Sequence, residues 1–275
     1  MHKGSILITG CSSGIGLCVA HGLRQRGYRV FATVRNPADV EALAQQGLES
    51  LPLDLANPAS ITGAVNTVLS RSDGRLDAVF HNGAYGQSGA VEDLSRATLR
   101  EQFETNVFGW HELTNCLLPV MREQGHGRII YNSSVLGFVA LRYRGAYNAS
   151  KYAIEGLADT LRLELRGTGI HVSLIEPGPI TSLFRVNALA AYQRNIDPAQ
   201  SVHREAYEHM EQRLTKEGPA VPFTLPPEAV LKRVIHALES PRPKARYPVT
   251  FPTYLFATLK RILPVRLLDR MLHGI

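Results

Sequence analysis

The sequence has few cysteines, and their spacing fits neither a disulfide framework nor a zinc site. Its 275 residues contain three of them, Cys11, Cys18 and Cys116. An odd number with this spacing favours a reducing compartment. Cys18 and Cys116 are then best interpreted as small buried apolar residues. Cys11 has no base beside it in sequence, and we expect its thiol not to be catalytic.

Long apolar runs and basic tracts are also missing. No apolar run reaches the ~18 residues of a spanning helix, and no charged leader with a cleavage site precedes the first strand-like run. We therefore expect a cytoplasmic protein. No lysine/arginine tract carries interleaved aromatics, so we expect no nucleic-acid partner. No His/Cys cluster has ligand spacing, so we expect no metal. The net charge of +6 is compatible with phosphorylated ligands or an anionic membrane surface.

Strand-like and helical patterns alternate along most of the chain. Strand-like runs occupy residues 5–10, 28–35, 48–55, 75–82, 127–134 and 169–178, and helical spacing occupies 14–27, 37–47, 58–72, 98–122, 146–166 and 226–240. This alternation predicts one α/β domain, residues 1–275, with a parallel sheet covered by helices on both faces. The stretch 180–225 interrupts the alternation, and we expect it to cover a substrate.

A glycine-rich loop, TGCSSGIG, joins the first strand to the first helix. Gly10, Gly14 and Gly16 permit a tight turn and a close backbone approach at a helix N-terminus that attracts a pyrophosphate. The alternative is a turn that needs glycine only for packing. Its place directly after the first strand favours a nucleotide site.

The end of the second strand indicates which nucleotide. NAD sites commonly carry an acid about 20 residues after the loop, where it binds the ribose 2′-hydroxyl. This sequence has Arg35 there, and arginine offers a planar fork to the 2′-phosphate of NADP. Ser12 and Ser13 add hydroxyl donors nearby. The residues thus favour NADP(H), although a solvated arginine at a strand end is the simpler alternative.

Tyr147 and Lys151 are four residues apart at the start of a predicted helix, so they share one face. A nearby cation favours the ionised form of a phenol. The pair is either a tyrosine tuned for proton transfer or an ordinary exposed pair, and the spacing alone does not decide between them.

Taken together, these motifs resemble the short-chain dehydrogenase/reductase family over residues 5–185. TGxxxGIG is matched by Thr9, Gly10, Gly14, Ile15 and Gly16, and YxxxK by Tyr147 and Lys151. The family's active serine falls on Ser134, its helix asparagine on Asn106, and its adenine-side acid on Asp54. Its proline-glycine turn beside the nicotinamide falls on "EPGPI".

The resemblance implies a doubly wound Rossmann fold and a role for each matched residue. The implied catalytic residues are Asn106, Ser134, Tyr147 and Lys151. Tyr147 exchanges a proton with the substrate oxygen, Ser134 hydrogen-bonds that oxygen, Lys151 lowers the tyrosine pKa and holds the ribose, and Asn106 anchors a water. The implied NADP(H) site comprises Gly10, Ser12, Ser13, Gly14, Ile15, Gly16, Arg35, Asp54, Leu55, Asn82, Tyr147, Lys151, Pro177, Gly178, Ile180 and Ser182.

Two positions depart from the family pattern. The family's Asn-Asn-Ala-Gly appears as His81-Asn82-Gly83-Ala84, which is expected to shift the backbone packing against the adenosine. The family's threonine after the proline-glycine turn appears as Ser182, whose hydroxyl can make the same hydrogen bond.

Within the family, the chain looks most like bacterial NADP-dependent aldehyde reductases, with the 17β-hydroxysteroid and retinol dehydrogenases as relatives. The resemblance therefore implies a small apolar carbonyl or alcohol substrate and a homo-oligomer, dimer or tetramer. Hydroxysteroid, retinol or 3-oxoacyl substrates are alternatives, as is a regulatory protein that binds NADP without catalysis.

The C-terminal stretch, residues 253–275, is an amphipathic extension. Leu255, Phe256, Leu259, Ile262 and Leu263 recur at helical spacing, with Lys260, Arg261, Arg266 and Arg270 among them, and Pro264 is expected to break the helix. One interpretation is a helix packed over the pocket or in a dimer interface, which apolar stripes usually favour. The other is peripheral contact with a membrane.

Overall fold

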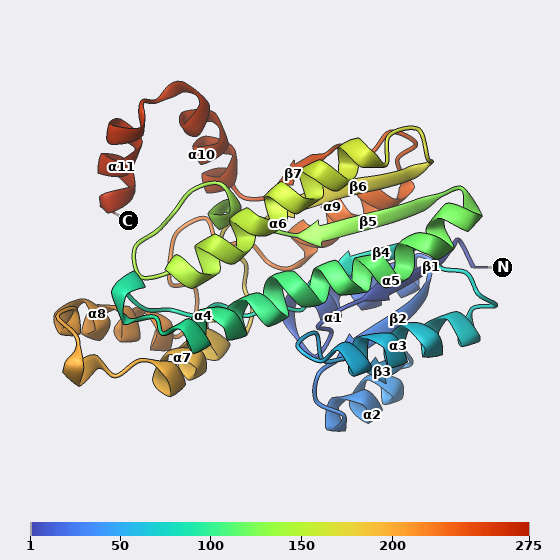
Figure 1. Cartoon of the computed structure of the whole chain (residues 1–275), viewed down its shortest axis with the longest axis horizontal. Coiled ribbons are helices and arrows are strands. Elements are labelled where there is room, and N and C mark those ends of the chain that lie inside the picture. Colours follow the sequence, from blue (N-terminus) through green and yellow to red (C-terminus); the bar gives the residue numbers. More distant parts are fainter. Residues whose placement is uncertain (1, 275) are drawn as a thin grey trace.

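The computed structural model describes residues 2–274 and is built on a seven-stranded sheet. Its strands are β1 (Ser5–Ile8), β2 (Arg29–Val34), β3 (Glu49–Pro52), β4 (Ala78–His81), β5 (Gly127–Asn132), β6 (Ile170–Glu176) and β7 (Arg246–Pro248). They are ordered β3-β2-β1-β4-β5-β6-β7, and all neighbours are parallel (Figure 1). The predicted doubly wound parallel sheet is confirmed. The chain order reverses between β1 and β4, where open α/β sheets form a ligand crevice.

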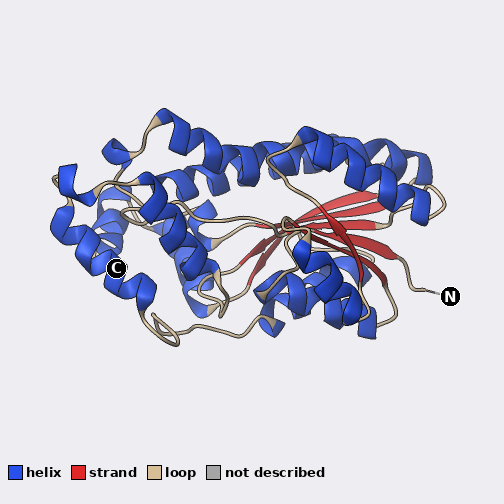
Figure 2. Ribbon diagram, turned by 90° about the horizontal axis from the view of Figure 1, so that it is seen from below, coloured by secondary structure: helices blue, strands red, loops and turns tan. Residues whose placement is uncertain are grey.

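Two layers of helices enclose the sheet, as Figure 2 shows. One face is covered by α3 (Pro58–Arg71), α5 (Gly109–Gln124) and α6 (Gly145–Glu164), and the other by α1 (Gly14–Gln25), α2 (Ala38–Gln45) and α9 (Glu228–Glu239). The apolar spacing of the helices explains this burial. Val19 and Leu23 of α1, one turn apart, pack in the same cluster as Val230 and Val234 of α9.

The helix predicted over 98–122 is interrupted in the structure. It divides into α4 (Arg96–Phe103), a π-helical turn η2 (Glu104–Phe108) and α5. Asn106 lies within the wide turn, and its side chain binds the backbone of Tyr85. A π-helical turn contains one residue more than an α-helical turn. This hardly changes the spacing of the apolar residues, so the sequence pattern does not show it. Such turns are frequent at functional sites.

The remaining helices gather beyond the carboxyl ends of the strands (Figure 1). The stretch 180–225 forms α7 (Phe184–Asn195) and α8 (Arg204–Thr215), and the C-terminus forms α10 (Phe251–Ile262) and α11 (Val265–His273). Pro264 separates the last two, as predicted. Short 3-10 turns are η1 (Val91–Asp93), η3 (Val135–Gly137) and η4 (Pro198–Gln200). Within residues 2–274, no helix is both long and apolar enough to cross a bilayer.

Strand β7 was not predicted. It has only three residues, too few for an alternation to be visible in the sequence, and it pairs with the end of β6 from Leu174↔Arg246 to Glu176↔Pro248. Its position brings Arg246 to the sheet beside Glu176.

Candidate active site

A cavity of about 1540 Å³ opens at the carboxyl ends of the strands. Its lining comes from the segments after β1 to β6 and from the helices α7, α8, α10 and α11. Most of the residues predicted for the site line it: Gly10, Ser12, Ser13, Gly14, Ile15, Arg35, Asp54, Leu55, Asn82, Ser134, Tyr147, Lys151, Pro177, Gly178, Ile180 and Ser182. Gly16 and Asn106 do not line it and lie just behind its wall.

The glycine loop has the geometry of a phosphate cradle. Gly10 and Gly14 have φ of 71° and 56°, a region that only glycine adopts without strain. A side chain at Gly16 would come within 2.1 Å of the Gly10 carbonyl oxygen, so this glycine serves close packing. Among the described residues no side chain caps the start of α1 and no acid lies in its first turn. The first N–H groups of α1 therefore remain available to a pyrophosphate.

Asn82 braces this loop from the neighbouring strand end. Its amide nitrogen Nδ2 donates to the carbonyl oxygens of Thr9 and Gly10, both at 3.0 Å, and Asn132 donates to its Oδ1 at 3.0 Å. The backbone N–H of Gly83 donates to Thr9 Oγ1 at 2.8 Å. Although Gly83 stands where the family has alanine, this segment remains hydrogen-bonded to the end of β1.

The two residues expected to bind the ribose and the adenine of the cofactor follow neighbouring strands of the sheet. Arg35 follows β2 directly, and its side chain is exposed at the cavity. Asp54 follows β3, and its carboxylate accepts from the Ala56 N–H at 3.0 Å. Both side chains therefore lie where the ribose and the adenine of a dinucleotide are expected.

Tyr147 and Lys151 lie in the first two turns of α6, with both side chains against the cavity. Lys151 Nζ donates to the Asn132 carbonyl oxygen at 2.7 Å and lies 5.6 Å from the centre of the Tyr147 ring. Phe184 of α7 packs edge-on against the same ring, with 5.2 Å between ring centres. Tyr147 is thus held between the sheet and the covering helix, which is not the setting of an ordinary exposed pair.

Burial dominates the electrostatics of this pair. It raises the pKa of the Tyr147 phenol, while a hydrogen bond with the Ser134 side chain acts in the opposite direction. Burial also lowers the pKa of the Lys151 ammonium to about 7, opposed by the charge of Glu155. The expectation that Lys151 lowers the tyrosine pKa therefore meets a stronger opposing effect. At neutral pH the phenol carries its proton and is a donor.

Asn106 is fully buried below the pair. Its Nδ2 donates to the Tyr85 carbonyl oxygen at 2.9 Å and to Ser150 Oγ at 3.2 Å, and its Oδ1 accepts from the Tyr85 N–H. These bonds tie the π-helical turn to α6. The side chain is thus engaged in fixing the wall that carries Tyr147 and Lys151.

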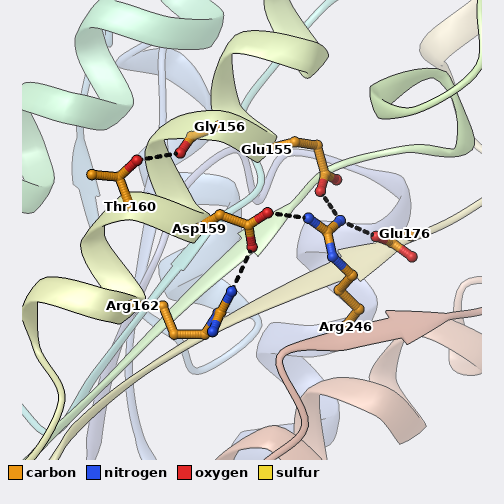
Figure 3. Close-up of polar contacts among 7 residues, drawn as sticks. All are labelled: Glu155, Gly156, Asp159, Thr160, Arg162, Glu176 and Arg246. Carbon is orange, nitrogen blue, oxygen red and sulfur yellow. Dashed lines mark hydrogen bonds and ion pairs between the residues drawn. The ribbon is translucent and has the colours of Figure 1, made fainter.

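Sequence reasoning missed the groups that surround Lys151. Its ammonium lies over the ring of Trp110, and the next turn of α6 carries the buried Glu155. Glu155 belongs to a cluster in which Arg246 also binds Glu176 at 2.7 Å and Asp159 at 2.6 Å (Figure 3). Burial raises the pKa of Glu155 to about 7. The position of Glu155 four residues after Lys151 was the available signal.

Comparison with known proteins decides the family. The sequence profile described as short chain dehydrogenase matches residues 5–213. The chain belongs to the short-chain dehydrogenases.

Several relatives share nearly the whole length of this dehydrogenase. It is 44% identical over 270 residues to the uncharacterized oxidoreductase YbbO of Escherichia coli (strain K12), covering 98% of this chain and 94% of the relative. It is 32% identical over 278 residues to 17-beta-hydroxysteroid dehydrogenase type 1 of Homo sapiens, covering 95% and 81%. A crystal structure of an actinorhodin polyketide ketoreductase variant with NADPH matches with a TM-score of 0.74 at 26% identity, covering 90% and 97%. The resemblance is confirmed, and the chain is an oxidoreductase of this family.

Cys11 of this short-chain dehydrogenase lies within the glycine loop but does not line the cavity. Its side chain is fully buried, and its thiol donates to the Ile8 carbonyl oxygen at 3.3 Å. Burial raises the pKa of the thiol to about 12. A protonated, buried thiol is a poor nucleophile, which supports the expectation that Cys11 is not catalytic.

The far wall of the cavity is largely apolar. Side chains from η3 and the loop after it, and from α7, α8, α10 and α11, contribute Leu136, Val139, Phe184, Ala188, Met210, Leu214, Phe256 and Leu272. Phe256 and Leu272 pack against the cluster of Leu136 and Val139. The inner face of the C-terminal hairpin thus covers the cavity, as one of the two interpretations of this stretch predicts.

Proposed function

We propose that this dehydrogenase is an NADPH-dependent reductase of apolar aldehydes, which moves hydride between the nicotinamide and a carbonyl or alcohol carbon. The observation that carries the proposal is the place of Tyr147. Its side chain lies at the cavity together with Ser134, whose hydroxyl lowers the phenol pKa against the effect of burial, and its ring packs edge-on against Phe184 on the apolar wall. A carbonyl oxygen directed at Tyr147 would thus place its apolar chain among these side chains.

The glycine loop and the strand ends support the cofactor. The residues that would hold it are those of the implied NADP(H) site, and the uncapped start of α1 and the glycine cradle fit a pyrophosphate. Arg35 supports NADPH over NADH, because a guanidinium can bind the 2′-phosphate of NADPH through two parallel N–H donors. When bound, the nicotinamide supplies or accepts the hydride.

Side chains of the protein donate the proton to the carbonyl oxygen and stabilise the negative charge that develops on it. Hydride addition makes the carbonyl oxygen more negative, and Tyr147 Oη donates its proton to that oxygen. Ser134 Oγ donates a hydrogen bond to the same oxygen and polarises the carbonyl. The Lys151 ammonium, held by the Asn132 carbonyl, stabilises the phenolate left on Tyr147. Asn106 keeps the wall of α6 in place and, in this proposal, holds the water that returns a proton through Lys151.

The size and polarity of the cavity support an apolar substrate. After the cofactor residues are set aside, most of its remaining lining is aliphatic or aromatic. An extended hydrocarbon chain gains ~0.8 kcal/mol for each CH₂ that leaves water. We therefore expect kcat/KM to rise with chain length until the wall formed by α8 and α11 is reached.

A substrate panel tests this function. Saturated aldehydes and methyl ketones of increasing chain length, a hydroxysteroid ketone, retinal and a 3-oxoacyl thioester are offered with NADPH or NADH, and absorbance of the reduced cofactor is followed. The proposal predicts the highest kcat/KM for medium or long aldehydes with NADPH. Preference for a steroid, retinal or the thioester would assign an alternative substrate class. Cofactor binding without turnover of any compound would instead support the regulatory alternative.

We also propose that the protein is a homo-oligomer. The outer faces of η2 and α6 expose Phe108, Tyr152, Leu157 and Leu163, and exposed apolar side chains on adjacent elements favour protein contacts. Sedimentation equilibrium measures this directly. A monomer mass at micromolar concentration would refute the proposal.

A further inference from the structure

The C-terminal hairpin formed by α10 and α11 has two different faces. Its inner face, with Phe256, Leu268 and Leu272, packs against η3 and the cavity. Its other end is a turn that stands clear of the sheet and of the other helices (Figure 1). We call this turn, residues 261–266, the hairpin tip.

The hairpin tip combines exposed apolar side chains with flanking cations. Its sequence is Arg-Ile-Leu-Pro-Val-Arg. Ile262 and Val265 are 70% and 73% exposed, and Arg261 and Arg266 on either side are also exposed. Large apolar residues exposed at the point of a projecting turn contribute little to folding, so their presence indicates contact with something outside the chain.

The same pattern continues along α11. Leu267 and Met271, one turn apart, are both exposed, and Arg266 and Arg270 form an adjacent row at the same spacing. Residues 251–274 carry four cations, Lys260, Arg261, Arg266 and Arg270, and one acid, Asp269. Within the described part of the chain, none of the three arginines forms a salt bridge. The outer surface of the hairpin is therefore apolar and positively charged at once.

We propose that the hairpin tip docks on an anionic lipid surface, with Ile262 and Val265 entering the interface and Arg261 and Arg266 binding lipid phosphates. The charge complementarity selects this occupant. A basic amphipathic element buries its apolar side in the headgroup boundary and pairs its cations with anionic lipids. A second copy of the chain fits less well, because a symmetric contact through the tip would bring the arginines of two copies together.

The location of the tip connects docking to the cavity. The helices that lead into and out of it, α10 and α11, line that cavity through Leu255, Phe256 and Leu272. If the proposed reductase function holds, docking brings the cavity to the surface where long apolar aldehydes partition. The docking itself does not depend on catalysis and is measured without turnover.

Vesicle co-sedimentation of the full-length protein tests the proposal. The probes are vesicles of phosphatidylcholine alone and of phosphatidylcholine with an equal amount of phosphatidylglycerol. Two double variants, Arg261→Gln/Arg266→Gln and Ile262→Gln/Val265→Gln, separate charge from apolar insertion, because the second removes the apolar side chains without changing the charge. Val202→Gln is the matched control, since Val202 is 86% exposed and lies outside the hairpin. None of these five side chains lines the cavity, so reduction of a short water-soluble aldehyde should be unchanged.

We expect the wild type to bind the anionic vesicles far more tightly than the neutral ones. A cation near an anionic surface contributes roughly fivefold in binding. The arginine variant should therefore lose about 25-fold on anionic vesicles, and the neutral Ile262/Val265 variant should lose binding to them, while Val202→Gln binds as the wild type does.

Two results would overturn the proposal. One is wild-type binding that is absent from both kinds of vesicle or equal on the two. The other is a tip variant that binds the vesicles as the wild type does. If that variant also has a lower mass in sedimentation equilibrium, a second copy of the chain covers the tip.

Discussion

The Lys151 ammonium nitrogen lies 4.3 Å from the centre of the Trp110 ring. Trp110 is fully buried in α5, donates from its indole nitrogen to the Gly83 carbonyl oxygen at 2.8 Å, and is the only tryptophan of the sequence. An aromatic face stabilises a nearby cation, by ~2 kcal/mol when both groups are out of water. The ring therefore favours the charged form of Lys151, which burial disfavours.

Replacing Trp110 should shift the pH dependence of turnover. Burial lowers the Lys151 pKa to about 7, and loss of the ring removes support for the charged form, so this pKa falls further. In Trp110→Leu, the limb on which kcat/KM is lost as pH rises should move to lower pH by about one unit. Trp110→Phe retains an aromatic face and should shift less. A uniform loss at every pH, with the limb unmoved, would assign Trp110 a purely structural role.

Arg35 should decide between NADPH and NADH. Removing a charge-assisted phosphate contact costs ~1.5–3 kcal/mol, which is roughly one to two orders of magnitude in preference. Arg35→Asp also places an acid where it repels the 2′-phosphate and accepts from a free 2′-hydroxyl, so we expect the preference to reverse.

The measurement for Arg35 is kcat/KM for both cofactors at one ionic strength. Arg166→Asp is the control, because Arg166 is an exposed arginine outside the cavity. Ser12 and Ser13 retain some phosphate binding and should blunt the reversal. A wild type that prefers NADH, or a ratio that Arg35→Asp leaves unchanged, would refute the role of Arg35.

The cluster around Arg246 should stabilise the fold behind α6, the helix that carries Tyr147 and Lys151. Arg246→Met leaves the buried carboxylates of Glu155 and Glu176 without their cation (Figure 3). Loss of one partner of a buried ion pair costs ~3–5 kcal/mol of unfolding free energy. Arg29→Met breaks the more exposed pair with Glu49 at 2.7 Å and should cost about 1 kcal/mol or less. Urea denaturation compares the two, and equal losses would contradict the prediction.

The sequence predicted the fold because the βα alternation is a local pattern, and it brought forward the candidate catalytic residues through short motifs of the family that it resembles. The βα alternation fixed the parallel sheet, and the spacing of Tyr147 and Lys151 survives in α6 as neighbours on one face. The sequence did not show β7, which is too short for a pattern, or the π-helical turn, which hardly changes the apolar period.

The surroundings of Lys151 could not be predicted for a different reason. Trp110 and Arg246 reach it, directly or through Glu155, from elements far away along the chain. Burial then acts on Tyr147 and Lys151 more strongly than their spacing suggests. Tertiary packing sets both the contacts and the dielectric environment, and neither has a local signature.

The rate of NADPH oxidation by Tyr147→Phe with the best aldehyde of the panel tests the proposed proton donor most directly. The substitution removes the phenolic proton and keeps the ring that packs against Phe184. Tyr152→Phe is the matched control, since Tyr152 lies on the same helix with a partly exposed side chain outside the cavity. The proposed role of Tyr147 predicts a loss of ~10²- to 10⁴-fold in kcat for Tyr147→Phe, nearly unchanged NADPH affinity, and wild-type turnover for Tyr152→Phe. Reduction by Tyr147→Phe at the wild-type rate would contradict it.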